Sequence, residues 1–432
     1  MRKAYLNGII LDGTENMEPK AGMVIITDCD RIVRIAPKDE IDAYELRDCE
    51  IVNLGGGYIM PGLINMHVHI PGSGKISKET SDTKKVVKLM MSNPITRAYG
   101  HRMYNKFALQ ALLSGVTTER SVGGIRSYDT ALRSRIEAGK VLGPRILASN
   151  MAVSVPGGHM AGSLAYEATS PDEAAEYVRL IAKDSPDLIK LMITGGVLDA
   201  EEIGSPGIVK MPQEYVNAAC DQAHKLGLPV AAHVESLEGV KVALRGGVDT
   251  IEHGATLDEE AVELFKIHGA SHIQTILPTQ YFSKVDREFT AASDKDVANG
   301  DIVMEGVINC AKTCLKEGIP VGLGTDAGCP FSPQYSFWRE LVCMVKYVGV
   351  TPKQALYHAT LGNARIANID ELTGSIEEGK CADMIVTYDN PLENMNTLGQ
   401  LKMVIVRGDL IRDPKIKKFK DIERILDDIL VI

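Results

Sequence analysis

Short apolar runs alternate with amphipathic stretches through the middle of the chain, and this alternation limits its possible folds more than any other feature of the sequence. The runs predict buried strands, and stretches such as residues 172–183 and 212–226 predict helices between them. Strands that alternate with helices favour a parallel sheet. The eight runs are residues 58–70, 116–122, 145–150, 187–193, 229–234, 250–253, 271–277 and 321–326.

Eight such units over residues 61–372 suit a closed (β/α)8 barrel, which typically takes about 250 residues plus insertions. A doubly wound open sheet is the alternative. It usually carries a glycine-rich phosphate turn, and the sequence contains neither G-x-G-x-x-G nor G-x-x-x-x-G-K-[ST]. The sequence therefore predicts an α/β chain built around a TIM barrel.

Both ends of the chain differ from the middle, because they contain short apolar runs broken by turns such as Asp12-Gly13 and Gly408-Asp409. This pattern predicts strands without intervening helices. We expect residues 1–57 and 374–432 to form one small β-sandwich domain together, and residues 58–373 to form the barrel.

The composition excludes several classes of protein. Lys and Arg number 47 and Asp and Glu number 57, so the net charge is −10, which disfavours nucleic-acid binding. The eight cysteines include no C-x-x-C pair, which favours reduced thiols in the cytoplasm. No apolar segment reaches the length of about 18 residues that a membrane span needs. We expect a cytoplasmic homo-oligomer that acts on a small molecule.

Polar side chains gather where the predicted strands end. In a (β/α)8 barrel the carboxyl ends of the strands form the active face. His67 and His69 lie on one strand, two residues apart, so both rings point to the same side. The residues that could meet at one mouth are His67, His69, His159, Lys190, His233, His253 and Asp326.

Lys190 is unusual because it lies inside the apolar run Asp187-Leu-Ile-Lys-Leu-Met-Ile. A buried lysine costs several kcal/mol unless it is neutralised or paired. Either it forms an ion pair with a neighbouring carboxylate, or CO2 carbamylates it to an anion that can bridge two divalent ions.

Several motifs occur in an order that resembles the amidohydrolase superfamily. Met60-Pro-Gly-Leu-Ile-Asn-Met-His67-Val-His69 is similar to its first-strand signature. Val230-Ala-Ala-His233, Ile251-Glu-His253-Gly, Gly324-Thr-Asp326-Ala and Gly379-Lys-Cys-Ala-Asp383 continue the pattern. Other segments, among them Gly115-Val-Thr-Thr and Gly157-Gly-His159, resemble the branch that holds prolidase-like and arginine-type carboxypeptidases and imidazolonepropionase-related enzymes.

The resemblance implies a centre of two divalent metal ions. His67, His69 and Asp326 would hold one ion, His233 and His253 the other, and Lys190, as N6-carboxylysine formed with CO2, would bridge both. Such donors suit zinc, with manganese or cobalt as substitutes. A metal-bound hydroxide would attack the carbonyl of an amide, Asp326 would shuttle the proton, and His159 would bind the substrate and stabilise the oxyanion.

Two positions depart from the family pattern. Ser121 stands where relatives more often have Asp, and Glu235 stands where carboxypeptidase-like relatives often have Tyr. Glu235 either faces the substrate, where it would repel a carboxylate, or pairs with an Arg or Lys of a loop.

Three functions therefore compete. The first is a binuclear amidohydrolase that cleaves a peptide-like, N-acyl or cyclic amide, with a carboxypeptidase or prolidase acting on dipeptides as its variant. The second is a deaminase of a nitrogen heterocycle, against which Lys190 argues, because such enzymes usually keep one metal. The third is a non-catalytic assembly protein, which would typically have lost metal ligands that are all present here.

Overall fold

The structure is a computed structural model of the chain, in which residues 1–75 and 83–430 are described. The chain divides into two compact units. The first comprises Met1–Asn65, Leu109–Thr118 and Tyr335–Lys418, and the second comprises Met66–Ala108, Glu119–Gln334 and Phe419–Ile432. The domain boundaries expected after residues 57 and 373 stay a prediction.

Strands from both ends of the chain meet in the first unit, as the sequence predicts. The C-terminal strand β18 (Met384–Thr387) pairs with β7 (Tyr58–Pro61) in antiparallel register. Side chains of both sheets form one apolar core, which is consistent with the expected sandwich. The sheets have the orders β5 (Arg31–Pro37), β4 (Met23–Asp28), β1 (Arg2–Leu6), β6 (Glu50–Asn53) and β20 (Asp409–Arg412), β19 (Met403–Val406), β18, β7, β2 (Ile9–Ile10), β3 (Lys20–Ala21).

Every one of the eight predicted runs contains a strand. Five of these strands pair in parallel and lie in sequence order, without the reversal that a doubly wound sheet requires. The strands are β7 with β8 (Leu63–Val68), β9 (Val116–Ser121), β10 (Arg145–Ala148), β13 (Ile189–Met192), β14 (Val230–Val234), β15 (Thr250–His253), β16 (Ser271–Gln274) and β17 (Val321–Leu323).

The closed barrel itself is not confirmed, because the strands form two sheets, β10-β9-β8 and β12-β11-β13-β14-β15-β16-β17. The third run is interrupted at Asn150, whose φ of 60° lies in the left-handed region. Strand β10 before this break pairs within the first sheet. Strand β11 (Ala152–Ser154) after it lies beside β13, and β12 (Ala165–Glu167) extends the same sheet. Two short strands thus share the place predicted for one.

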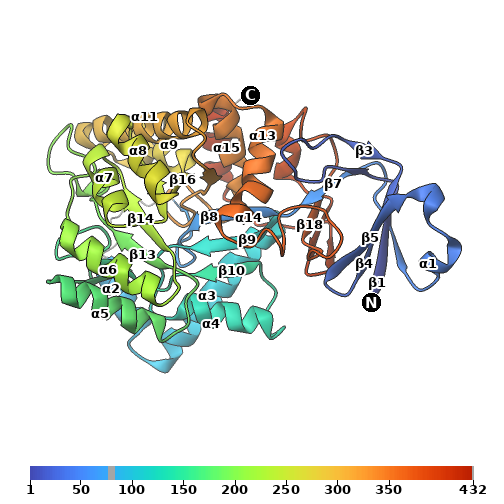
Figure 1. Cartoon of the computed structure of the whole chain (residues 1–432), viewed down its shortest axis with the longest axis horizontal. Coiled ribbons are helices and arrows are strands. Elements are labelled where there is room, and N and C mark those ends of the chain that lie inside the picture. The colour runs from blue at the N-terminus through green and yellow to red at the C-terminus, as the bar shows by residue number, and fades with distance from the viewer. Residues whose placement is uncertain (76–82, 431–432) are drawn as a thin grey trace. The chain divides into compact units, whose positions relative to one another are not determined.

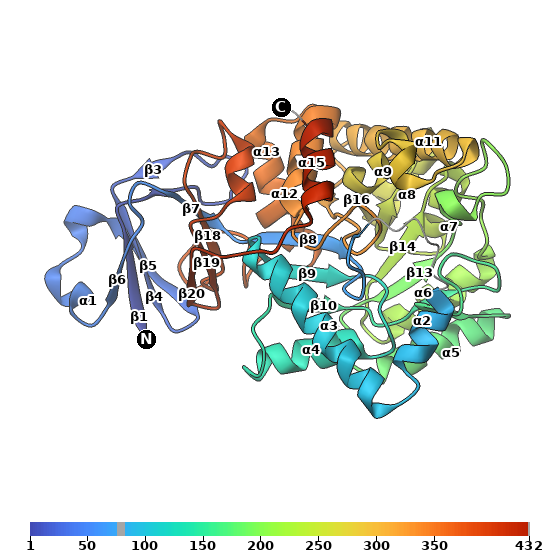
Figure 2. The same cartoon turned by 180° about the vertical axis from the view of Figure 1, so that it is seen from behind.

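Helices alternate with the strands of the second unit, and Figures 1 and 2 show them along the outside of the sheet. Ser170, Ser236 and Asp258 cap α5, α7 and α8 through hydrogen bonds from backbone N–H groups. Helix α15 is not predicted by the β pattern of the C-terminus. The helices are α1 (Ala43–Arg47), α2 (Thr83–Met90), α3 (Pro94–Leu113), α4 (Tyr128–Glu137), α5 (Pro171–Ala182), α6 (Gln213–Lys225), α7 (Leu237–Arg245), α8 (Glu259–His268), α9 (Ile276–Ser283), α10 (Arg287–Thr290), α11 (Asp294–Lys316), α12 (Phe337–Cys343), α13 (Pro352–Tyr357), α14 (Asn363–Ile366) and α15 (Lys420–Ile429).

None of the helices in the described part of the chain is both long enough and apolar enough to cross a bilayer.

Candidate metal centre

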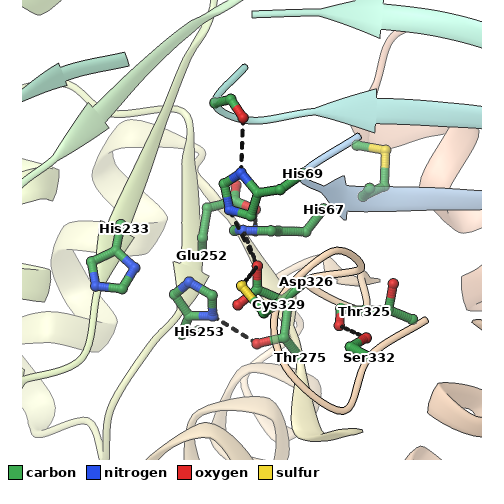
Figure 3. Close-up of polar contacts among 12 residues, drawn as sticks. His67, His69, His233, Glu252, His253, Thr275, Thr325, Asp326, Cys329 and Ser332 are labelled. Atoms are coloured by element: carbon green, nitrogen blue, oxygen red, sulfur yellow. Dashed lines mark hydrogen bonds and ion pairs between the residues drawn. The ribbon is translucent and has the colours of Figure 1, made fainter. Parts of the chain in front are cut away.

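Four histidines meet at the carboxyl ends of three strands (Figure 3). His67 belongs to β8 and His69 directly follows it, while His233 belongs to β14 and His253 to β15. The ring centroids are 5.6 Å apart for His67 and His69, 4.7 Å for His67 and His253, and 4.8 Å for His233 and His253. The structure therefore brings together the histidines that the sequence placed at one mouth.

Asp326 lies between His67 and His69. Its Oδ1 is 3.6 Å from Nε2 of His67 and 3.2 Å from Nε2 of His69. The loop after β17 reaches this place because the backbone N–H of Asp326 donates to the carbonyl of His67 at 2.9 Å. Gly324 makes the approach possible, since a Cβ there would lie 2.3 Å from Cβ of His67.

The backbone is strained at two of the strand ends. His253 has a φ of 67° and Asp326 a φ of 51°, values that non-glycine residues seldom adopt. Such strain persists only where the surrounding structure holds it, and it concentrates at functional sites.

Hydrogen bonds fix the orientation of three rings. Nδ1 of His67 donates to Oε2 of Glu252 at 2.7 Å, and Nδ1 of His69 donates to the carbonyl of Gly123 at 2.9 Å. Nδ1 of His253 shares a hydrogen bond of 2.7 Å with the hydroxyl of Thr275. With Nδ1 engaged, Nε2 is the atom each ring can offer a metal, as in many metal sites.

Glu252 belongs to a fully buried polar group beneath the histidines. Its Oε1 accepts from Arg120 at 2.6 Å and from the hydroxyl of Thr250 at 2.6 Å. Arg120 also donates to the carbonyl of Met66 at 2.7 Å. Burial favours the neutral acid, but Arg120 and His67 outweigh it and hold the pKa of Glu252 well below its usual range. Glu252 is therefore an anion that orients His67.

The electrostatics of the centre suit metal binding. Burial, followed by the charge of Lys190, lowers the pKa of His67 to about 4. Burial and neighbouring cationic groups also lower the pKa values of His233 and His253 far below the usual range. Burial opposes ionisation of Asp326, yet the hydrogen bond with His69 and the nearby imidazoles keep its pKa well below normal. Neutral imidazoles and an ionised carboxylate are the forms that bind metals.

Lys190 is buried on β13 with a relative exposure of 1%. Its Nζ has no hydrogen-bond partner among the described residues. Burial lowers its pKa to about 8, despite the opposing charge of Glu252. The expected alternative of an ion pair is not found in residues 1–75 and 83–430.

His159 and Glu235 both lie next to His233. The ring of His159 stacks on that of His233 with centroids 4.2 Å apart, and its Nδ1 donates to Asp199 at 2.6 Å. Oε1 of Glu235 is 4.0 Å from Nε2 of His233, while Oε2 has no partner within the described part of the chain. Burial raises the pKa of Glu235 to about 8. No described Arg or Lys pairs with it.

The donor atoms fall into three overlapping groups, each with its atoms within 4.8 Å of one another. This arrangement fits two ions, since the groups extend from His69 to Glu235 and the carboxylate of Asp326 belongs to two of them. The expected division of the ligands between two ions stays a prediction. The groups are His67, His253 and Asp326; His69, Asp326 and Cys329; and His233, Glu235 and His253.

The sequence interpretation gives no role to Arg120, Glu252 or Asp199. Arg120 and Glu252 carried a usable signal, because each is a charged residue inside an apolar run, like Lys190. Asp199 lies in the short helix η2 (Val197–Asp199), forty positions from His159, and its sequence neighbourhood carried no such signal.

Comparisons with known proteins agree with this geometry. The family model described as "Amidohydrolase family" matches residues 58–411. Ochratoxinase of Aspergillus niger is 26% identical over 372 residues, which is 80% of this chain and 73% of that protein.

Two solved structures are similar over nearly the whole chain. One is a protein from Bifidobacterium longum that has been assigned as a prolidase by name only. It has a TM-score of 0.86 and 33% identity, and the match covers 99% of this chain and 98% of that one. The other, a Xaa-Pro dipeptidase with methionine in its active site, has a TM-score of 0.81 and 27% identity, covering 95% and 100%.

Proposed function

Because the chain belongs to the amidohydrolase family and is a metal-dependent hydrolase of carbon–nitrogen bonds, we propose that it is a binuclear enzyme that cleaves an amide bond. The observation that supports two ions most strongly is the buried amine of Lys190, for which the described ranges offer no hydrogen-bond partner. Carboxylation by CO2 would turn this amine into an anion with two oxygens, and two cations would then compensate its charge.

The proposed ligands follow from the arrangement of the donor atoms. His67, His69 and Asp326 would hold one ion, and His233 and His253 the other, with carboxylated Lys190 between them. Imidazole and carboxylate donors favour zinc. Bound divalent ions would polarise the scissile carbonyl and acidify a water molecule.

The protein's own groups would move the protons and bind the oxyanion. Asp326 would take a proton from the attacking water and deliver it to the leaving amine, because its carboxylate is ionised and lies at the centre of the site. His159 would donate from Nε2 to the developing oxyanion in its imidazolium form, in which Nδ1–H is donated to the carboxylate of Asp199.

Glu235 is proposed to select the substrate. Its carboxyl is adjacent to His233, and a free α-carboxylate next to it would be disfavoured whenever Glu235 is ionised. Amides without that carboxylate, or with an amine or guanidine, would be preferred.

Dipeptide hydrolysis is the second candidate, and the similarity to the Xaa-Pro dipeptidase favours it. The two candidates differ in whether the preferred substrate carries a free α-carboxylate. A deaminase would release ammonia without separating an acyl group.

Two measurements on the purified protein test the proposal. Metal analysis should give about two ions per chain, and mass spectrometry should detect CO2 on Lys190. Hydrolysis should then be compared for pairs of substrates that differ only at the C-terminus, as free acid or as amide. Turnover of the amides with about two metals supports the proposal. Faster turnover of the free acids favours the dipeptidase, and one metal with ammonia release favours a deaminase.

A further inference from the structure

A thiol lies among the metal-binding groups without a role in the proposed reaction. Sγ of Cys329 donates to Oδ1 of Asp326 at 3.3 Å (Figure 3). The same oxygen is 3.2 Å from Nε2 of His69. Cys329 therefore presents sulfur to the place where His69 and Asp326 converge.

These separations suit donors of a single ion. Metal–nitrogen and metal–sulfur bonds of zinc are about 2.0–2.1 and 2.3 Å, so neighbouring ligands of one ion, at angles of about 90–110°, lie roughly 2.9–3.8 Å from one another. The distances from the Asp326 oxygen to the sulfur of Cys329 and to Nε2 of His69 both fall within that range.

The backbone holds Cys329 in this position. Its N–H donates to the carbonyl of Asp326 at 3.1 Å, and the N–H of Gly328 donates to the carbonyl of Ser332 at 2.9 Å. Gly328 has a φ of 106°, and a Cβ there would lie 2.1 Å from the carbonyl oxygen of His69. The turn is therefore closed against β8, which directs the thiol to Asp326.

We propose that Cys329 is a thiolate ligand of the ion that His69 and Asp326 bind, and that it makes this position prefer zinc, cadmium or cobalt over manganese. The inference rests on the proposed binuclear function. On coordination the S–H bond breaks, a metal–sulfur bond forms, and the proton passes to solvent. Soft thiolate donors select softer ions, whereas carboxylate and water suit manganese.

Cobalt provides a direct readout, because a thiolate bound to cobalt(II) gives a charge-transfer absorption in the near ultraviolet. The protein would be stripped with a chelator and reloaded with cobalt, and metal analysis would count the bound ions. The wild type is compared with Cys329→Ser, Cys329→Ala and, as control, Cys29→Ser, which changes an exposed cysteine of the first unit.

We expect the absorption in the wild type and in Cys29→Ser, and its loss in both variants at position 329. In those variants the ratio of cadmium affinity to manganese affinity should also fall at least about tenfold. Two results overturn this inference and leave the proposed function standing. One is an absorption that persists in the variants without Cys329, and the other is a wild type that binds about two cobalt ions but shows no charge-transfer absorption. A wild type that fails to bind cobalt overturns both.

Discussion

Two buried charged side chains near the centre differ in how they are compensated. Glu252 on β15 has an exposure of 0% and accepts hydrogen bonds from His67, Arg120 and Thr250. Lys190 on β13 is equally buried, and its amine has no hydrogen-bond partner in the described ranges. Burying an unpaired charge costs far more than burying a paired one. The difference teaches that the polypeptide itself supplies the partners of Glu252, whereas none of the described residues supplies a hydrogen-bond partner for the amine of Lys190.

Removing the amine tests this contrast most severely. Lys190→Ala should lose metal and at least about a thousandfold in activity, because the bridging anion disappears. Short carboxylic acids should restore part of the activity by occupying the vacated space. Turnover and metal content are measured together, with the exposed Lys225→Ala as the control. If Lys190→Ala kept both its metal and its activity, Lys190 would need no outside partner.

Asp326→Asn tests the carboxylate that lies next to His67 and His69. The amide keeps the size of the side chain but cannot accept a proton, so kcat should fall at least about a hundredfold. Metal content should fall less than turnover does. Steady-state kinetics at saturating metal measure the effect. Near-normal turnover would move the proton transfer to another group, with His159 the next candidate.

Glu252→Gln tests the other member of the comparison, the buried carboxylate that has its partners within the chain. It leaves Arg120 buried without its counter-ion and weakens the acceptor of His67, so metal affinity should fall about 10–100-fold. Competition with a chelator measures the affinity. Glu119→Gln is the matched control, because Glu119 is also fully buried but no contact with the histidines is found for it in the described chain. Equal losses in the two variants would show that Glu252 has no special role in orienting His67.

Glu235→Gln should change selectivity by a smaller amount. Burial raises the pKa of Glu235 to about 8, so the effect should be measured above that pH, where Glu235 is ionised. There, removing the ionisable group should narrow the advantage of C-terminal amides over free acids about five- to tenfold, which is roughly 1–1.4 kcal/mol. The ratio of kcat/KM for matched substrates measures it. A wild type that already prefers the free acids would contradict the assignment of Glu235 and leave the metal chemistry unaffected.

The last prediction concerns Glu119 and the stability of the fold instead of activity. Neither of its carboxylate oxygens has a partner among the described residues, and burial raises its pKa to about 8. Between the ordinary pKa of glutamate and about 8, the folded chain keeps a proton that the unfolded chain has lost. Raising the pH through this window therefore destabilises the fold by up to about 1.4 kcal/mol per unit.

Glu119→Gln removes this titration, so the free energy of unfolding of the variant should rise relative to that of the wild type as the pH rises from about 5 to about 8. Denaturant midpoints at several pH values measure the difference. A constant gap would mean that Glu119 has an ordinary pKa in the folded chain.

The sequence was sufficient for the strands and for the gathering of the histidines, because apolar runs predict strands and the ends of parallel strands meet on one face. It was insufficient for closure of the barrel, since the turn at Asn150 depends on one left-handed residue, and the strand β11 that follows it lies beyond the predicted run. The contacts of Arg120 with Glu252 and of His159 with Asp199 join distant parts of the chain. Only packing in three dimensions decides such pairs.

The left-handed turn at Asn150 also separates β10 from the segment that bears His159. Strands β11 and β12 pair in parallel register from Ala152 and Ala165, and they anchor both ends of the segment that bears His159. None of the proposed metal ligands lies in that segment. A segment tied down at both ends can change its sequence and length at little cost to the proposed ligands, as long as His159 keeps its stacking contact with His233. We therefore expect that exchange of residues 155–164 with His159 retained would alter substrate binding and leave the metal centre as it is.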